Sequence, residues 1–294
     1  MTGRPEEYSF IRYLAAKQDL DDRSLNRHVR ETLARHLLET RRTPPLRVLE
    51  VGCGIGTMLE RLLDWRLLFE ADYTGIDFHP GNIAEARARF RRYAAARGGE
   101  LAVAAKFEAI DLFDFLAREQ DLAAWDLIVA HAFLDLVDLE ATLPGLLALL
   151  AEGGFFYFTL NFDGATIFEP TIDPELDRLI ETLYHRSMDE RRVDGRPAGS
   201  SRTGRRLFGQ LTAAGATLLA AGSSDWLVFP GSDGYPGDEA YFLHFIIHTI
   251  QQSLEGHPEL PAADFRAWVA QRQAQVQRRE LIYIAHQLDF FGRV

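Results

Sequence analysis

The chain has 294 residues, of which 47% are apolar and 26% are charged, a composition typical of globular proteins with a substantial core. Its net charge of −11 argues against a general nucleic-acid binder, because phosphate binding needs a basic surface. The single cysteine excludes an intramolecular disulfide. The sequence has no run of roughly 18 apolar residues, so we expect no membrane-spanning helix. We therefore expect a cytoplasmic protein with neither a nucleic-acid nor a membrane partner.

The N-terminal segment, residues 5–40, has apolar residues near helical spacing. We expect two helices, broken around Asp19 to Arg23, with Asp22 or Ser24 as the cap of the second. A first strand then begins near Arg47.

The stretch after Arg47 predicts a strand, a glycine turn and a helix. Arg47 to Val51 is short and largely apolar, glycines follow at positions 52, 54 and 56, and a helical pattern begins at Thr57. The free N–H groups of a helix N-terminus would lie beside this turn, and glycine lets a ligand approach the backbone closely. A turn that binds a ligand is one interpretation, and a purely structural tight turn is the other.

Three further strands are predicted at Asp72–Asp77, Lys106–Asp111 and Trp125–His131. Each ends in a polar side chain, and the carboxyl ends of parallel strands border the crevice where α/β proteins bind ligands. Asp77 follows Gly56 by 21 residues, about the distance at which dinucleotide folds place a ribose-binding acid. The alternation of strands and helices indicates parallel pairing with right-handed crossovers.

The second half of the chain departs from this alternation. After a fifth strand at Ala151–Leu160, residues 163–202 predict a long excursion without a strand. A segment of that length is typically a functional lid or disordered, and its apolar residues favour an ordered lid. Further elements are predicted in the order helix 201–214, strand 216–219 extending to 226–229, helices 238–254 and 262–278, and a last strand 280–289.

The glycine turn has the form Glu-x-Gly-x-Gly-x-Gly, starting at Glu50, and not the Gly-x-Gly-x-x-Gly of dinucleotide binders. This pattern, with the strand landmarks over roughly residues 45–162, resembles the class I S-adenosylmethionine-dependent methyltransferases. The resemblance implies one Rossmann-like, doubly wound α/β domain with a seven-stranded sheet of order 3-2-1-4-5-7-6, strand 7 being antiparallel, and helical lid insertions. Its expected parts are a helical cap 1–42, a cofactor-binding core 43–162, a lid 163–202, and a C-terminal part 203–294 with a helical insertion 238–278.

The resemblance also implies that the cofactor is S-adenosyl-L-methionine. Asp77 would bind the ribose hydroxyls, and Asp111 the adenine amine. The expected cofactor-binding residues are Glu50, Gly52, Cys53, Gly54, Gly56, Thr57, Asp77, Phe78, Asp111, Leu112 and His131.

His131 would face the methyl acceptor at the end of its strand. We interpret it as a catalytic base or hydrogen-bond acceptor, with a packing or cofactor-contact role as the equal alternative. Tyr8, Tyr13 and Lys17 are candidates for contact from the N-terminal segment. The candidate substrate-binding residues are Tyr13, Phe133, Asn161, Tyr184, Arg186 and His244.

We expect methyl transfer to a small-molecule acceptor by direct displacement, because the long lid would enclose a small substrate and the acidic balance disfavours RNA or DNA. A protein methyltransferase, or a non-catalytic binder of S-adenosylmethionine or S-adenosylhomocysteine, are the alternatives. No metal is expected, since His244 and His248 lack further ligands by spacing. The sequence does not decide the oligomeric state, and a homodimer is kept open.

Overall fold

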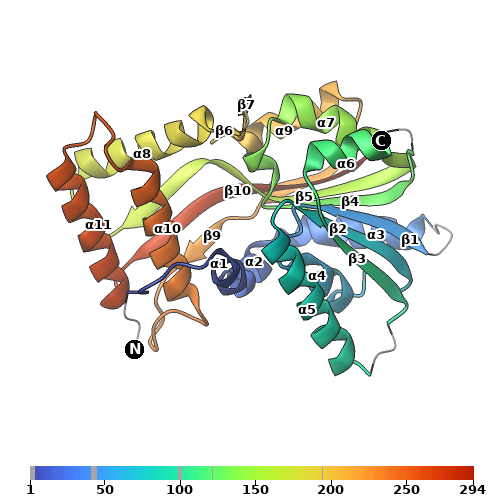
Figure 1. Cartoon of the computed structure of the whole chain (residues 1–294), viewed down its shortest axis with the longest axis horizontal. Coiled ribbons are helices and arrows are strands. Elements are labelled where there is room, and N and C mark those ends of the chain that lie inside the picture. Colours follow the sequence, from blue (N-terminus) through green and yellow to red (C-terminus); the bar gives the residue numbers. More distant parts are fainter. Residues whose placement is uncertain (1–3, 41–44, 99–100, 121, 194) are drawn as a thin grey trace.

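The computed structural model describes residues 4–40, 45–98, 101–120, 122–193 and 195–294. Its main sheet has the strand order β3-β2-β1-β4-β5-β10-β8, and β9 also pairs with β10 (Figure 1). β10 is antiparallel to its neighbours β5, β8 and β9. With β10 as the seventh strand and β8 as the sixth, the predicted order is confirmed. The predicted boundary between residues 42 and 43 lies outside the described residues.

The parallel half of the sheet holds the edge at which a ligand would bind. Val51 of β1 lies opposite Ile76 of β2 and Ala130 of β4, so these three strands end at one level. Helical crossovers join them, as parallel pairing requires. The strands are β1 (Leu46–Val51), β2 (Ala71–Asp77), β3 (Val103–Ala109) and β4 (Trp125–His131), and the helices are α4 (Thr57–Asp64), α5 (Pro80–Ala96), α6 (Leu112–Glu119), η1 (Leu134–Leu136) and α7 (Leu139–Ala148).

The sheet has a hydrophobic core on each face. Helices α6, α7 and α9 lie over one face, and α3, α4 and α5 lie over the other (Figure 1). Buried aromatic residues of β5 serve both cores, because side chains alternate along a strand: Phe156 and Phe158 face one side, and Phe155 and Tyr157 the other. This two-sided burial is typical of doubly wound α/β folds.

The fifth strand is longer than the sequence predicted. β5 spans Leu150–Glu169, and its last part pairs with β10 (Ile282–Arg293), with Thr166 opposite Ala285 and Glu169 opposite Ile282. The prediction that 163–202 contains no strand is therefore wrong for 163–169, and also for the short strands Arg192–Val193 and Arg196–Pro197. An Asp-Gly pair such as Asp163-Gly164 is typical of a turn, and Gly164 has a φ of +76°. The strand nevertheless continues past it. Its pairing partner lies more than 100 residues away in the sequence, beyond the reach of local patterns.

The N-terminal segment forms three helices, α1 (Phe10–Ala16), α2 (Gln18–Ser24) and α3 (Arg27–Glu39), not the two predicted. The first break falls at Lys17 and the second at Leu25, outside the predicted interval. Asn26 caps α3 by accepting a hydrogen bond from the N–H of Val29 at 3.1 Å, so neither Asp22 nor Ser24 is the cap. Asp22 instead forms an ion pair with Arg61 of α4.

The remaining elements extend the sheet and cover its far end. They are α8 (Pro174–Glu190), the short strands β6 (Arg192–Val193) and β7 (Arg196–Pro197), α9 (Thr203–Ala213), β8 (Thr217–Ser223), β9 (Trp226–Val228), α10 (Glu239–Leu254) and α11 (Ala262–Gln277). Helices α8, α10 and α11 gather around the extensions of β5 and β10 (Figure 1). Within the described ranges, no helix combines the length and apolarity that crossing a bilayer demands.

Helix α8 packs into the core, and we infer from this packing that it is part of the scaffold and not a mobile lid. Ile180 and Leu183 are each 1% exposed, and both pack in the larger hydrophobic core. The part of the 163–202 segment that remains outside the sheet and this helix is the β6–β7 hairpin and its flanks.

Truncation of Leu183 tests the scaffold role of α8. Leu183→Ala should lower the free energy of unfolding by about 2–5 kcal/mol, because it opens a cavity in a packed core. The control is Thr182→Ala, an exposed neighbour on the same helix, which should stay within about 1 kcal/mol of the wild type. Denaturant unfolding measures both, and equal stability of the two variants would identify α8 as a loosely docked lid.

Candidate functional site

The glycine turn between β1 and α4 has a backbone that only glycine adopts readily. Gly52, Gly54 and Gly56 have φ values of +66°, +53° and +82°. A Cβ atom on Gly52 would come within 2.1 Å of the Phe133 ring, so this position has no room for a side chain. The turn leads into the N-terminus of α4 at Thr57, whose first N–H groups lack intrahelical acceptors.

A cavity of about 840 Å³ opens over this turn at the carboxyl ends of the strands. Its volume lies in the range of ligand pockets, about 300–1,000 Å³. All the predicted cofactor residues except Gly56 line it. The other walls come from α1, from the residues after β4 and from the β6–β7 hairpin, including Phe10, Leu14, Lys17, Phe133, Leu136, Val137, Val193, Arg196, Pro197 and Ala198.

Asp77, at the end of β2, already accepts three hydrogen bonds. Its Oδ2 accepts from the N–H of Gly54 at 3.0 Å, and its Oδ1 accepts from the N–H of His79 at 2.8 Å and from Asn82 Nδ2 at 3.1 Å. A carboxylate offers about four acceptor positions, so Oδ2 keeps one for a ligand. Asp77 thus supports the turn and also faces the cavity.

Asp111 and Glu50 complete the acidic lining. Asp111 caps α6 by accepting a hydrogen bond from the N–H of Phe113 at 2.8 Å. Glu50 is 1% exposed and accepts a hydrogen bond from the Tyr73 hydroxyl. Burial raises the pKa of Glu50 to about 8, and the bond from Tyr73 offsets this only in part. The Glu50 carboxyl is therefore protonated at neutral pH.

Neither ring nitrogen of His131 is free. Nε2 lies 3.1 Å from Asp21 Oδ2, and Nδ1 lies 2.8 Å from the Thr159 hydroxyl oxygen. Burial lowers the pKa of His131 to about 4, so its ring is neutral at neutral pH. The Asp21 carboxylate can only accept, which assigns the proton to Nε2 and leaves Nδ1 to accept from Thr159. Neither ring nitrogen therefore has a free lone pair that could take a proton from a methyl acceptor.

The predicted substrate-binding residues do not gather at this cavity, and only Phe133 lines it. Tyr13 stacks on Phe242 and Phe245, and Asn161 is buried and donates to the Leu288 carbonyl. Arg186 forms an ion pair with Glu259, and His244 contacts Gln273 inside the α10–α11 pair. Tyr184 lines a different cavity. Of the N-terminal candidates, Lys17 lines the cavity over the glycine turn, whereas Tyr8 stacks on His248.

Sequence reasoning missed the contribution of the β6–β7 hairpin and of Leu14 in α1. The hairpin strands have two residues each, too short for a periodic signal. Leu14 belongs to an apolar helical repeat, and nothing local distinguishes a cavity wall from core packing. A cluster of three or more metal-ligating side chains does not occur among the residues that the structure describes.

Comparisons with known proteins agree with this site. Residues 49–156 match the family model described as "Methyltransferase domain". Over residues 49–156 the chain is therefore similar to a methyltransferase domain, and S-adenosylmethionine is the cofactor of the class I methyltransferases that its motifs resemble. The matched range contains the glycine turn, Asp77, Asp111 and His131. None of the curated proteins matches the sequence.

Two solved structures with a similar fold are described as methyltransferases. An S-adenosylmethionine-dependent methyltransferase from Methanosarcina mazei has 15% identity and a TM-score of 0.48, covering 87% of this chain and 96% of its own. Phosphoethanolamine N-methyltransferase 2 from Haemonchus contortus, solved with S-adenosylhomocysteine, has 14% identity and a TM-score of 0.43. That match covers 90% of this chain and 52% of the other. Likenesses at this level carry no argument about the acceptor.

The glycine cradle and the donor set fit the cofactor. The turn brings bare backbone to the cavity, a carboxylate at the end of β2 retains an acceptor position, and Asp111 lies at the next strand end. These are the groups that a nucleoside with a charged amino-acid tail requires.

Substitution of Glu50 tests the protonation of this buried carboxyl. The pKa of Glu50 is about 8 in the fold and 4.5 as its ordinary value, so between these pH values the folded chain holds a proton that the unfolded chain releases. The free energy of unfolding of the wild type should therefore fall as the pH rises through this window. Glu50→Gln cannot ionise, so its stability relative to the wild type should grow with pH up to about 8, by about 1.4 kcal/mol per pKa unit.

Unfolding curves from pH 5 to 9 without ligand measure this difference, and the exposed Glu70→Gln serves as the control. A difference between Glu50→Gln and the wild type that does not change with pH would show that Glu50 is ionised in the fold.

Removal of the Asp77 carboxylate tests the cofactor site. Asp77→Ala should weaken binding of S-adenosylhomocysteine by ~5- to 150-fold, because a ribose hydroxyl loses its acceptor and the turn loses the bond to Gly54. Asp72→Ala, exposed on the same strand, should bind as the wild type does. Calorimetry gives both affinities, and normal binding by a folded Asp77→Ala would place the ribose elsewhere.

Proposed function

We propose that the protein transfers the methyl group of S-adenosylmethionine to a small-molecule acceptor held in the same cavity as the cofactor. The observation that carries this proposal is the single cavity of about 840 Å³, which is lined by the glycine turn and Asp77 and also by residues of α1 and of the hairpin. A space of this kind surrounds a small ligand, whereas a macromolecular substrate needs an open surface.

The reaction needs positioning more than proton transfer. When bound, S-adenosylmethionine supplies a methyl group on a sulfonium, so the acceptor lone pair forms its bond to carbon as the carbon–sulfur bond breaks. The chain has to hold the acceptor in line and exclude water, and such positioning can supply up to ~7–11 kcal/mol in favourable cases. Leu14, Phe133 and Pro197 supply apolar walls for this purpose.

His131 is a positioning residue in this proposal. Both its nitrogens are engaged, and it joins the end of β4 to Asp21 in α2. It therefore fixes the N-terminal helices over the cavity rather than taking a proton from the acceptor. The role as a base would require the bond to Thr159 or to Asp21 to break.

Two alternatives share the cofactor site. A protein methyltransferase would have to admit a side chain of its substrate into this same cavity. A non-catalytic binder would have the same glycine turn and carboxylates but no turnover. Incubation with methyl-labelled S-adenosylmethionine separates the three: the proposal predicts label in a small-molecule fraction of cell extract, label in protein favours the first alternative, and no label with intact cofactor binding favours the second.

Replacement of the hairpin tests the acceptor half of the cavity. The N–H of Ala198 bonds to the carbonyl of Arg191 at 2.9 Å, so residues 192–197 can be replaced by Gly-Gly without moving their ends. Val193, Arg196 and Pro197 line the cavity but lie outside the hydrophobic cores. Turnover should fall by at least about tenfold, because the acceptor loses its enclosure.

Affinity for S-adenosylhomocysteine and the melting temperature of that variant should stay close to those of the wild type, since the turn, Asp77 and Asp111 are untouched. Turnover at the wild-type rate would show that the hairpin does not enclose the acceptor.

A further inference from the structure

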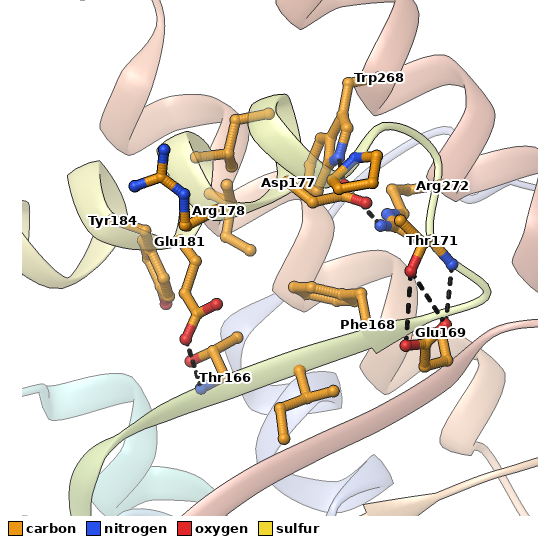
Figure 2. A pocket seen from close by; sticks show the side chains of 14 residues that line it. Thr166, Phe168, Glu169, Thr171, Asp177, Arg178, Glu181, Tyr184, Trp268 and Arg272 are labelled. Carbon is orange, nitrogen blue, oxygen red and sulfur yellow. Dashed lines mark hydrogen bonds and ion pairs between the residues drawn. The ribbon is translucent and has the colours of Figure 1, made fainter.

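A second cavity, of about 290 Å³, lies between the end of β5, helix α8 and helix α11 (Figure 2). It shares no lining residue with the cavity over the glycine turn, which we call the cofactor cavity. Thr159 of β5 lies beside His131, and the second cavity begins at Thr166, seven residues further along the strand. At about 3.3 Å per residue this is roughly 20 Å, far beyond the reach of methyl transfer. The second cavity is therefore a separate site.

One end of this cavity is formed by a fully buried arginine. Arg272 is 0% exposed, forms an ion pair with Asp177 at 2.7 Å, and lies 5.3 Å and 5.2 Å from the ring centres of Phe168 and Trp268. Two of its nitrogens are satisfied, by Asp177 and by the Pro170 carbonyl and Gln275. Its Nε has no hydrogen-bond partner among the described residues. Because this nitrogen has no accessible surface, Arg272 closes the end of the cavity without presenting a donor to it.

At the other end lies a carboxylate that forms no ion pair with a cation of the described residues. Glu181 extends from α8 toward β5 (Figure 2), and its one hydrogen bond within the described ranges is a long one, 3.4 Å, from the N–H of Thr166. Tyr184 lies one turn further along the helix, and its hydroxyl makes no hydrogen bond to another described residue. Arg178 lines the mouth and is exposed, pointing away from Glu181 in Figure 2. Three carboxylates, those of Glu169, Asp177 and Glu181, and two guanidinium groups line the cavity, so the lining carries a net negative charge.

The walls between these ends are apolar. Phe168, Ile180, Ile250 and Trp268 line them, and the rings of Phe168 and Trp268 meet edge to face at 90°. A carboxylate beside aromatic rings is the combination that binds organic ammonium groups, through charge and cation–π attraction. The small volume limits the ligand to about the size of an amino acid.

We propose that this second cavity binds a small organic ammonium compound, with its cation at Glu181 and its apolar body against Phe168 and Trp268. The site is independent of the cofactor cavity, so it binds its ligand whether or not S-adenosylhomocysteine is present. It is thus a second small-molecule site and not the acceptor position.

A matched pair of probes tests the recognition. Phenylalaninol carries an ammonium group, a hydroxyl and a ring, and 3-phenylpropan-1-ol is the same molecule without the ammonium group. Calorimetry with the full chain, saturated with S-adenosylhomocysteine, should show one phenylalaninol per chain. The uncharged alcohol should bind at least about tenfold more weakly, because it makes no charge-assisted contact.

Two variants locate the site. Glu181→Gln keeps the shape and the acceptor for the Thr166 N–H but removes the charge, and should weaken phenylalaninol binding by at least about tenfold. Glu175→Gln is exposed on the same helix outside the cavity and should bind as the wild type does. Melting temperatures check that both variants fold.

Three results would overturn the proposal: no binding of phenylalaninol, equal binding of the two probes, or equal binding by wild type and Glu181→Gln. Displacement of phenylalaninol by S-adenosylhomocysteine would also overturn it, because the probe would then occupy the cofactor cavity. None of these results depends on methyl transfer, so a failure here leaves the proposed activity standing.

Discussion

One buried carboxylate, that of Asp21, holds the N-terminal helices against the cofactor cavity. Lys17 Nζ lies 2.5 Å from it, Trp226 Nε1 2.9 Å and His131 Nε2 3.1 Å, while Arg61 lies 3.6 Å away. Burial raises the pKa of Asp21, but the charge of Lys17 and the hydrogen bond from His131 lower it by more than burial raises it. The net effect is a pKa well below the ordinary value, so the carboxylate is ionised. Loss of the carboxylate would leave the buried Lys17 ammonium without its ion-pair partner, which is strongly destabilising, whereas Arg61 would keep Asp22.

This interaction explains why helices α1 and α2 lie where they do. It joins α2 to the end of β4, to α4 and to β9, which are distant in the sequence but meet at the carboxyl edge of the sheet. Leu14 and Lys17 thereby become walls of the cavity. The enclosure of the site thus depends on a polar contact in the interior rather than on surface packing alone.

The parallel half of the fold could be predicted because its signals are local. Each of its features has a sequence pattern within a few residues: an apolar strand, a glycine turn with positive φ, and Asp77 at the end of a strand. The order of these patterns along the chain predicts the order of the strands in the sheet. The predicted cofactor residues line the cavity for the same reason, since parallel strands end at one edge. Gly56 is the exception, as its space is filled by Ala86 and Phe107.

The acceptor side could not be predicted in the same way. The extension of β5 depends on pairing with β10, and the position of Tyr184 depends on how α8 packs across that extension. Arg186 and His244 have partners, Glu259 and Gln273, that no local pattern indicates. In such segments, the sequence pattern of aromatic and basic residues is the same whether they line a cavity or complete a core.

The central claim is that the cavity over the glycine turn holds the methyl donor and leaves an enclosed space beside it. A crystal structure with S-adenosylhomocysteine tests this most directly. The account predicts the ribose at Asp77, the adenine near Asp111, and the sulfur facing the space bounded by Phe133 and Pro197. A ligand bound away from the turn, or one whose sulfur faces open solvent, would contradict it.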